Sequence, residues 1–285
     1  MSIISFKNVT YIYNEGTPVS YKALDDISLT IEENDFVALI GRTGCGKSTL
    51  VQHINALLHP TFGEVEVFDF LNAKKRKHRK GKAFNLRKKV GLVFQFPEYQ
   101  LFEETVLKDV AFGPRNFGYK EEEAVEKSKE ALKKVGLDES FYDRTPFELS
   151  GGEKRRVAIA GILASSPDVL VVDEPTAGLD PQGAREVMEL FKNIHEDGLT
   201  LILVTHDMNL VLDYANKVIV MDGGKINQIT TPTELFRKDI TSYSLEEPLI
   251  VSLAKYLESK GKIVDLAKYN TVEKIIDYFL EEKHG

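Results

Sequence analysis

The chain has 285 residues, of which 42% are hydrophobic and 28% are charged, and its net charge is −7. This balance excludes disordered, collagen-like and coiled-coil classes and provides enough apolar residues for a large core. The apolar runs fall far short of the ~20 residues of a membrane-spanning helix. A single cysteine excludes an internal disulfide or a cysteine metal cluster. Without a basic stretch followed by an apolar one at the N-terminus, no secretory signal is expected. We therefore expect an intracellular protein, either soluble or lying against a membrane.

The first third of the chain alternates short β-rich runs with turns. Residues 27–31 alternate apolar and polar side chains, as a half-buried strand does, and residues 36–40 are continuously apolar, as in a buried parallel strand. Between Leu71 and Lys89 stand ten Lys and Arg residues and no acid. Such a run contacts lipid headgroups or nucleic acid in some proteins, but the favoured interpretation is a solvated loop. A surface on which bases stack would need several aromatic residues among the charges, and this run has only Phe84.

The middle of the chain predicts an alternation of strands and helices. Residues 105–135 have helical spacing, and Glu121–Glu123 fits a helix start, where the helix dipole favours acids. Residues 169–172 and 200–204 are apolar runs typical of buried strands, and residues 181–195 between them have helical spacing. This order predicts an α/β fold with a parallel sheet covered by helices.

After Thr231-Pro232 the strand patterns cease and two amphipathic helices are predicted. Apolar residues at helical spacing mark them: Leu249, Ile250, Leu253, Ala254 and Leu257 in the first, and Val272, Ile275, Ile276, Phe279 and Leu280 in the second. Asn270 and Glu273 resemble a capping pair for the second helix. These helices either pack on their own domain or pair with another chain, and pairing is favoured.

Residues 41–48 match the phosphate-binding pattern G-x-x-x-x-G-K-[ST], between an apolar strand and a helical run. Its glycines let backbone N–H groups turn around phosphate oxygens, and the helix N-terminus adds its positive dipole end. Lys47 is expected to reach the β- and γ-phosphates and Ser48 to bind Mg²⁺. The candidate nucleotide-binding residues are Gly41, Arg42, Thr43, Gly44, Cys45, Gly46, Lys47, Ser48 and Thr49. Cys45 is interpreted as a small space-filling residue, although a bulky reagent on its thiol is expected to block ATP binding.

A second motif places two carboxylates directly after the strand at residues 169–172. Ligands of open α/β sheets gather at this edge of the sheet. Asp173 is expected to hold Mg²⁺, directly or through water, and Glu174 to orient and deprotonate the attacking water. Together with the phosphate loop, the pair predicts an ATPase.

The sequence from about residue 3 to 235 resembles the ATP-binding-cassette (ABC) ATPases. The similar elements are the signature Leu149-Ser150-Gly151-Gly152-Glu153, Gln95, Gly178-Leu179-Asp180, His206 after an apolar strand, and Tyr13 ahead of the phosphate loop. The resemblance implies that Tyr13 stacks on adenine, that Gln95 senses Mg²⁺ and that His206 contacts the γ-phosphate. It also implies that Ser150, Gly151, Gly152 and Glu153 complete the nucleotide site of a second ATPase subunit. Glu153 stands where most cassettes have Gln, and a carboxylate there is expected to weaken that contact.

Longer segments resemble the energy-coupling-factor (ECF) transporter ATPases. They are residues 94–106, which begin Phe-Gln-Phe-Pro-Glu, together with residues 111–114 and 155–161. This resemblance implies a heterodimer with a paralogous ATPase beneath a membrane-embedded coupling protein, which carries a substrate-binding membrane subunit for a vitamin or a transition-metal ion. Tyr99, Leu101 and Phe102, rimmed by Glu98, Glu103 and Glu104, are expected to form the surface on which the coupling protein docks. The alternative is that these apolar side chains belong to the core.

The sequence as a whole therefore predicts a P-loop ABC ATPase core of α/β class with an antiparallel β subdomain, a helical subdomain and a helical extension. Residues 1–235 form the predicted nucleotide-binding domain, with the helical subdomain at about 97–165, and residues 236–285 form the predicted dimerisation segment. We expect an ATP hydrolase with Glu174, His206 and Lys47 as catalytic residues, and with Mg²⁺ held by Ser48, Gln95 and Asp173. The expected location is the cytoplasmic face of the cell membrane, without nucleic acid. The alternative is a soluble ABC ATPase that acts on nucleic acid or ribosomes.

Overall fold

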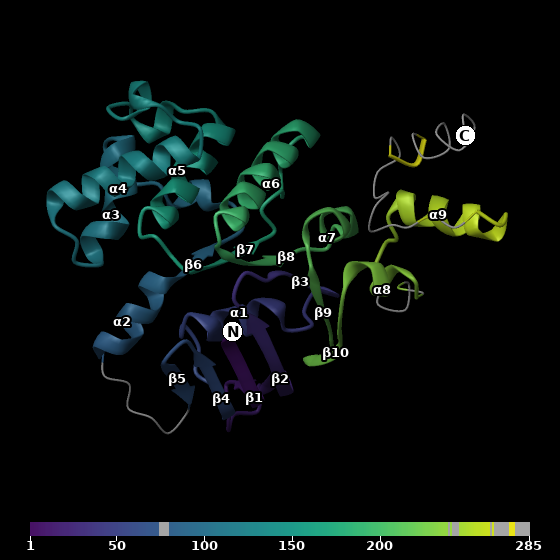
Figure 1. Ribbon diagram of the computed structural model, residues 1–285. Coiled ribbons are helices and arrows are strands. Elements are labelled where there is room, and N and C mark those ends of the chain that lie inside the picture. Colours follow the sequence, from purple (N-terminus) through teal and green to yellow (C-terminus); the bar gives the residue numbers. More distant parts are fainter. Residues whose placement is uncertain (74–79, 239, 241–244, 263, 265–273, 277–285) are drawn as a thin grey trace.

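The computed structural model describes residues 1–73, 80–238, 240, 245–262, 264 and 274–276. One of its two sheets is antiparallel, with the strand order β2-β1-β4-β5. Its strands are β1 (Ser2–Tyr13), β2 (Tyr21–Glu32), β4 (Phe62–Val67) and β5 (Phe70–Ala73). In Figure 1 this sheet lies beneath the rest of the molecule, and β2 contains the predicted strand at residues 27–31.

The second sheet is the predicted parallel one, with the strand order β10-β9-β3-β8-β7-β6. Its strands are β3 (Phe36–Gly41), β6 (Val90–Val93), β7 (Val169–Asp173), β8 (Thr200–Val204), β9 (Lys217–Asp222) and β10 (Lys225–Thr230). All neighbours pair in parallel except β10, which closes one edge antiparallel to β9. The strands predicted at residues 36–40, 169–172 and 200–204 are confirmed, and so is the α/β class.

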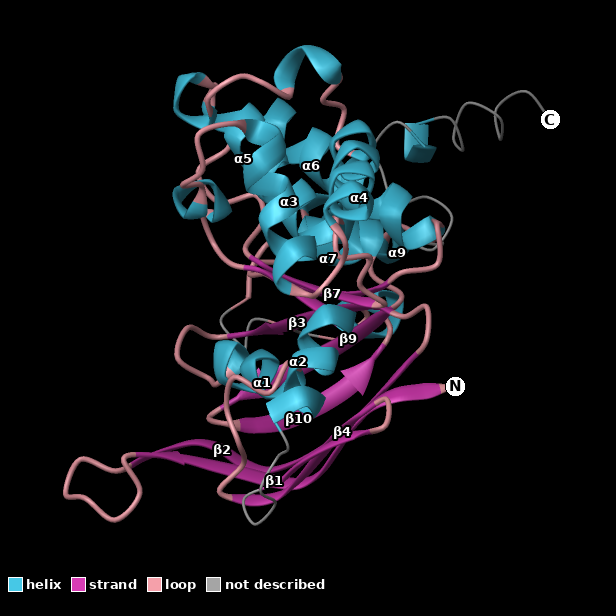
Figure 2. Cartoon of the chain, turned by 90° about the vertical axis from the view of Figure 1, so that its left-hand side faces the viewer, coloured by secondary structure: helices cyan, strands magenta, loops and turns pink. Residues whose placement is uncertain are grey.

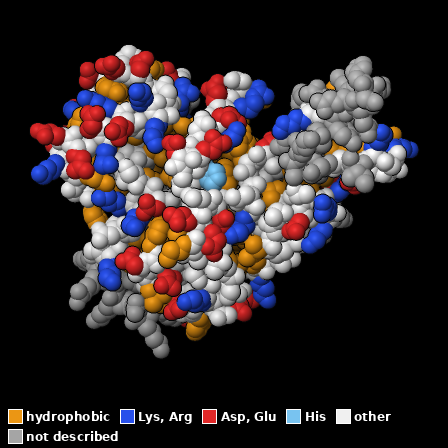
Figure 3. Space-filling model, viewed as in Figure 1, with side chains coloured by type: hydrophobic (Ala, Val, Ile, Leu, Met, Phe, Trp, Pro, Cys, Tyr) orange, Lys and Arg blue, Asp and Glu red, His pale blue; other side chains and the backbone are white. Residues whose placement is uncertain are grey.

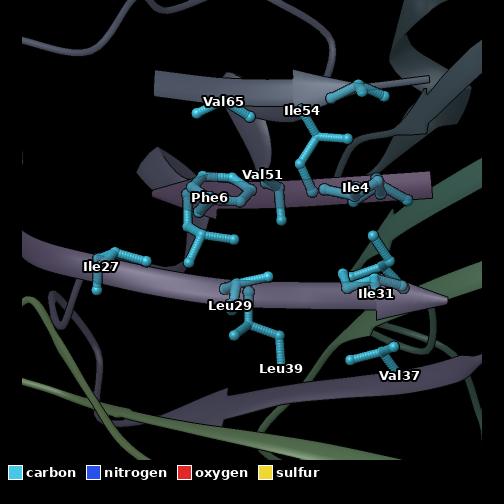
Figure 4. Packing of buried hydrophobic residues seen from close by; sticks show 14 of the residues in the cluster. Ile4, Phe6, Ile27, Leu29, Ile31, Val37, Leu39, Val51, Ile54 and Val65 are labelled. Atoms are coloured by element: carbon cyan, nitrogen blue, oxygen red, sulfur yellow. The ribbon is translucent and has the colours of Figure 1, made fainter. Parts of the chain in front are cut away.

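Helix α1 (Lys47–Ile54) lies between the two sheets and supplies the core that joins them. Figure 2 shows the layers, and Figure 4 shows Val51 and Ile54 of α1 among Phe6 of β1 and Leu39 of β3. These side chains are almost entirely removed from water, and burial of one such side chain contributes roughly 1.5–3 kcal/mol. The core therefore fixes the start of α1, where the phosphate loop ends.

The opposite face of the parallel sheet is covered by α6 (Pro181–Glu196) and by a group of helices, α3 (Val106–Asn116), α4 (Glu121–Lys134) and α5 (Gly151–Leu163). Figure 1 shows this group beyond the β6 edge of the sheet. The predicted helices at 181–195 and 105–135 are confirmed, the latter as two helices. They are separated near Gly118, which has a φ of 83° that favours glycine. The second begins at Glu121, as expected.

The basic run is not wholly a loop, because residues 80–89 form α2 (Lys80–Lys89). Leu86 is buried in the core between the sheets, and Arg87 donates to the carbonyl oxygens of Asn55 and Ala56. These contacts hold one face of the helix against the protein, so the interpretation of the run as a solvated loop is wrong for residues 80–89. Residues 74–79 lie outside the described residues.

The C-terminal part packs on its own chain in the segments that the structure describes. Helix α9 (Leu249–Ser259) confirms the first predicted tail helix. Its residues Ile250, Val251 and Ala254 are buried with side chains of α7 (Met208–Tyr214), α8 (Pro232–Phe236) and β9. Leu249 remains exposed at the start of the helix. Pairing with another chain, which the sequence favoured, stays a prediction. Of the second tail helix, the structure describes only residues 274–276; Asn270 and Glu273 lie outside the described residues.

Within the described residues, no helix has both the length and the apolarity that a membrane crossing requires.

A fully buried histidine, His53, lies near the end of α1. Its Nδ1 is 2.7 Å from the carbonyl oxygen of Thr49, its Nε2 has no hydrogen-bond partner among the described residues, and its ring packs edge-on against Tyr11. Burial lowers the pKa of His53 to about 4, against about 6.5 for an unperturbed histidine. Above pH 6.5 the residue is neutral in both the folded and unfolded states. Between pH 6.5 and 4 only the unfolded chain binds the proton, so stability falls by about 1.4 kcal/mol per pH unit.

Candidate functional site

A cavity of about 520 Å³ opens where the parallel strands β3, β6, β7 and β8 end, and most of the predicted site residues line it. Its lining comprises Tyr21, Ala23, Thr43, Gly44, Gly46, Lys47, Ser48, Thr49, Gln95, Asp173, Glu174 and His206. Segments far apart in the sequence therefore converge at the carboxyl edge of the sheet, the position at which open α/β folds bind ligands.

The phosphate loop connects β3 to α1 through two glycines that no other residue can replace without strain. Gly41 has a φ of 142°, and a Cβ there would lie 2.1 Å from the carbonyl oxygen of Met221. Gly46 caps α1 with a φ of 105°, and a Cβ there would lie 2.6 Å from the carbonyl oxygen of Ala23. The loop therefore wraps tightly, with the N-terminus of α1 directed at the cavity that Lys47 and Ser48 line.

The ammonium group of Lys47 occupies the loop itself. Its Nζ donates to the carbonyl oxygens of Gly41 at 2.6 Å and Arg42 at 3.2 Å. An anion with stronger acceptors, such as a phosphate, would draw this charge away from the two carbonyls because charge-assisted hydrogen bonds are the stronger ones. The geometry thus provides a cation that is already held at the mouth of the phosphate loop.

Two acids stand at the end of β7. Burial raises the pKa of Asp173, and the neighbouring charge of Glu174 raises it further, while Lys47 and the hydroxyl of Ser48 lower it. A divalent cation beside Asp173 would relieve both the desolvation and the repulsion. Ser48, Gln95 and Asp173 supply a hydroxyl, an amide and a carboxylate, which suits Mg²⁺ because this ion is held by few protein ligands together with substrate phosphates. No group of three or more His, Cys, Asp or Glu residues that could hold a metal was found in the part of the chain that the structure describes.

The side chains of Glu174 and His206 contact each other in the wall of the cavity. Nδ1 of His206 is 2.9 Å from Oε1 of Glu174, although His206 lies after the adjacent strand β8. Glu174 has a φ of 48°, a left-handed conformation that costs a residue with a side chain about 1–3 kcal/mol. Its N–H donates to the carbonyl oxygen of Val204, which ties the strained residue to β8. The left-handed backbone and this hydrogen bond therefore fix Glu174 at the end of β7, where its carboxylate meets His206.

Two tyrosines lie near the phosphate loop. The hydroxyls of Tyr13, the predicted adenine platform, and Thr49 are 3.2 Å apart, and Tyr13 is absent from the described lining of the cavity. Tyr21, which pairs with Tyr13 across β1 and β2, lines the cavity and donates to the carbonyl oxygen of Gly44 at 3.3 Å. Sequence reasoning missed Tyr21; its position before an alternating strand was the available signal, but the strand register was needed to place it.

The other loop residues divide between the cavity and the core. Thr43, Gly44 and Thr49 line the cavity, whereas Arg42 does not. The Cys45 side chain is 4% exposed and packs in the core between the sheets, where burial raises the pKa of its thiol. Cys45 is therefore a residue of the phosphate loop whose side chain is part of the core.

The signature residues do not join this cavity. Ser150 caps α5 and accepts from the N–H of Glu153 at 3.3 Å, while the Glu153 carboxylate accepts from the N–H of Ser150 at 2.7 Å. This reciprocal pair is a capping box. The hydrogen bonds from Ser150 lower the pKa of Glu153, so it stays ionised at neutral pH. Gly151 and Gly152 have open space around them. The signature thus forms a capped helix start, and none of its residues lines the cavity of the same chain.

The predicted docking surface needs two corrections. Tyr99 is 84% exposed and Phe102 is also exposed, packing edge-on against Phe112. Leu101, by contrast, is 9% exposed and belongs to the core of the helical group. Glu98 does not rim the surface either, because both of its carboxylate oxygens accept from Arg155 inside the protein. The buried positive charge of Arg155 accounts for the inward orientation of Glu98.

The fold and the site together define a P-loop nucleotide hydrolase of the cassette type. A model of the ABC transporter family matches residues 24–177. Proteins named energy-coupling factor transporter ATP-binding protein EcfA2 from Streptococcus pneumoniae and Streptococcus agalactiae are each 53% identical over 90% of this chain and 92% of their own.

Solved structures agree with these relatives. The chain superposes on cbiO1 from Clostridium perfringens, described as part of the ABC transporter complex cbiONQ, with a TM-score of 0.74 and 37% identity over 89% of this chain and 99% of that one. The ATP-binding cassette MJ0796, solved as a dimer in a post-hydrolysis state with ADP and Pi, matches with a TM-score of 0.69 and 33% identity over 80% of this chain and 98% of its own. The chain therefore belongs to the ABC transporter ATPases and, within them, to the energy-coupling-factor ATP-binding proteins.

Proposed function

We propose that this chain is the ATP-binding and ATP-hydrolysing subunit of an ECF-type importer for a vitamin or a transition-metal ion. The observation that carries the proposal is that the phosphate loop, the carboxylate pair and His206 converge on one cavity while the signature lies outside it. One chain therefore has two separate halves of an ATP site. Two ATPase subunits arranged head to tail would join the cavity of each to the signature of the other.

The phosphate loop binds the triphosphate in this proposal. Backbone N–H groups at the start of α1 take the β-phosphate, and Lys47 leaves the carbonyls of Gly41 and Arg42 for the β- and γ-phosphates. Ser48, Gln95 and Asp173 would hold Mg²⁺, which neutralises charge on the phosphate oxygens when it is bound.

Glu174 and His206, in the wall of the cavity, act in hydrolysis. Glu174 accepts a proton from the attacking water, and His206, whose Nδ1 is 2.9 Å from the Glu174 carboxylate, contacts the γ-phosphate in this proposal. Lys47 stabilises the charge that develops on the transferred phosphoryl group. Ser150 and Gly151 of this chain would contact the γ-phosphate of the ATP held by the paired subunit, so that ATP binding holds the two subunits together and hydrolysis separates them.

We further propose that the second ATPase is a paralogue, and that the pair lies on the cytoplasmic face of the cell membrane beneath a coupling protein, which carries the substrate-binding membrane subunit. Exposed Tyr99 and Phe102 support a docking surface for the coupling protein, with Glu103 and Glu104 as the acidic residues beside it. The relatives named as ECF transporter components and the cbiO1 structure support the same assembly.

A soluble ATPase acting on nucleic acid or ribosomes is not favoured. The similar proteins are named as transporter components. On the face shown in Figure 3, Asp and Glu side chains are interspersed with Lys and Arg among the residues drawn in colour. Nucleic-acid binding instead depends on basic side chains gathered into a patch.

The composite site is tested by Gly151→Glu. A side chain at Gly151 meets open space within its own chain, so we expect normal folding and normal nucleotide affinity. The added carboxylate would face the γ-phosphate of the paired subunit, and ATP-dependent association, measured by light scattering, should be lost. Gly81→Glu, also in open space on a helix, is the matched control. Unchanged association of the Gly151 variant would contradict the head-to-tail arrangement.

A further inference from the structure

Arg155, on α5, is buried and uses all five N–H donors of its guanidinium within the protein. Its Nε and an Nη donate to the two carboxylate oxygens of Glu98 at 3.1 and 2.8 Å. The Nη groups also donate to the carbonyl oxygens of Pro175 at 3.0 Å and Ala177 at 3.1 Å, the latter from both nitrogens. The side chains of Arg155 and Glu98 are 4% and 15% exposed. This is a desolvated ion pair in a fixed, fork-shaped geometry.

The partners of Arg155 come from two other segments of the ATP site. Glu98 lies in the short helix at residues 97–100, three positions after Gln95. Pro175 and Ala177 form the turn that follows Glu174, and the N–H of Ala177 closes this turn by donating to the carbonyl oxygen of Glu174. Arg155 therefore joins the signature helix to the loop after β6 and to the turn after β7.

Both joined segments contain a strained residue. Glu174 has a φ of 48° and Phe96 a φ of 56°. The guanidinium of Arg155 lies 5.9 Å from the centre of the Phe96 ring, and that ring lies 3.1 Å from the position of a Cβ on Gly178. A left-handed conformation persists in such residues only where the surroundings over-determine it. Arg155 donates to the turn that follows Glu174 and lies over the ring of Phe96. It therefore supports the left-handed conformation of both residues.

We propose that Arg155 is a positioning residue for hydrolysis: it holds the turn that presents Glu174 and couples that turn to the segment following Gln95. Displacement of the Gln95 segment, against which the membrane partner docks, then reaches the general base through one rigid ion pair. The inference rests on the proposed function in two respects, the assignment of Glu174 to hydrolysis and the docking of the coupling protein beside the Gln95 segment.

The decisive variant is Arg155→Lys, which keeps the positive charge but not the fork. A lysine ammonium is a single point with three donors, so it cannot hold a bidentate carboxylate and two carbonyls together. A displacement of ~1 Å at a reacting group costs up to about 100-fold in rate. We therefore expect kcat for ATP hydrolysis to fall at least about 10-fold while the KM for ATP changes less than about threefold.

Arg115→Lys is the matched control. Arg115 also holds a carboxylate with two nitrogens, that of Glu121, but this pair is exposed and makes no contact with the turn after Glu174. Glu98→Gln is the second variant; it keeps Arg155 but replaces one of the two acceptor oxygens with an NH2 donor, so it breaks one arm of the fork as well as removing the charge. If the lysine variant fails to fold, a wild-type kcat in Glu98→Gln overturns the proposal.

The experiment measures kcat and KM of the assembled transporter and, separately, the affinity of each variant for a fluorescent ATP analogue. A low kcat with unchanged affinity in Arg155→Lys, a smaller fall in Glu98→Gln and normal rates in the control support the proposal. Wild-type kcat in Arg155→Lys, or a change confined to KM, overturns it. An inactive wild-type complex would instead contradict the proposed function.

Discussion

The substitution Glu174→Gln separates nucleotide binding from hydrolysis. Gln has the same size and can keep the 2.9 Å contact with Nδ1 of His206, so the strained turn at Glu174 is retained. Only the capacity to accept a proton from water is lost. A positioned general base contributes about 10²–10⁴-fold to a rate, which is ~2.7–5.4 kcal/mol of activation free energy at 1.36 kcal/mol per tenfold. We therefore expect kcat to fall by two to four orders of magnitude with ATP affinity unchanged.

The assay for this prediction is phosphate release at saturating ATP, together with equilibrium binding of a fluorescent ATP analogue. Glu122→Gln, at an exposed position in the first turn of α4, is the matched control and should behave as wild type. The Glu174 variant should also accumulate in the ATP-bound dimer, because its bridge is not hydrolysed. Turnover within threefold of wild type would remove Glu174 from the role of general base.

Three further predictions concern the loop, the buried histidine and the signature. Gly41→Ala should lower the free energy of unfolding in thermal melts, since crowding against Met221 and the disfavoured φ each cost ~1–3 kcal/mol. Gly81→Ala, where the added methyl group meets open space, should not lower it. An unchanged melting temperature for Gly41→Ala would contradict the loop geometry. His53→Gln should remove ~2 kcal/mol of the difference in unfolding free energy between pH 6.5 and 5, measured by urea titration. In this range His53 takes up a proton in the unfolded chain but not in the folded protein, where its pKa is about 4. An equal dependence of stability on pH in both proteins would refute this. Glu153→Gln should keep the capping box, for which Gln also serves, and strengthen ATP-dependent dimerisation by removing a negative charge; weaker dimerisation would contradict the assignment of that carboxylate to the partner's nucleotide.

Local patterns were sufficient to predict the elements of the parallel sheet and the main chemistry. The strand ending at Gly41 and the strand ending at Asp173 are continuously apolar because both faces of the sheet are covered, and this pattern needs no tertiary knowledge. The same holds for Lys47 and Ser48, which a motif places at the start of a helix. Glu174 and His206 were both expected at the γ-phosphate, but their hydrogen bond depends on the adjacency of β7 and β8.

Contacts between distant segments were beyond the sequence. Glu98 was expected in the acidic rim of the docking surface, yet the buried Arg155, 57 positions away, draws it inward. Leu101 was placed on the docking surface and lies in the core of the helical group. Glu153 was interpreted only through its charge, whereas its capping box with Ser150 has a spacing that the sequence contained. Tyr21 reached the cavity through the pairing of β1 and β2, which no local pattern fixed.

Hydrolysis of ATP by this chain as part of a membrane importer is tested by purification of a tagged copy from detergent-solubilised membranes, followed by assay of Mg²⁺-dependent ATP hydrolysis in the eluate. We expect recovery of a second cassette ATPase and small membrane proteins, with hydrolysis that Glu174→Gln abolishes. Recovery of the chain alone, or with ribosomes or nucleic acid, would contradict the assignment to transport.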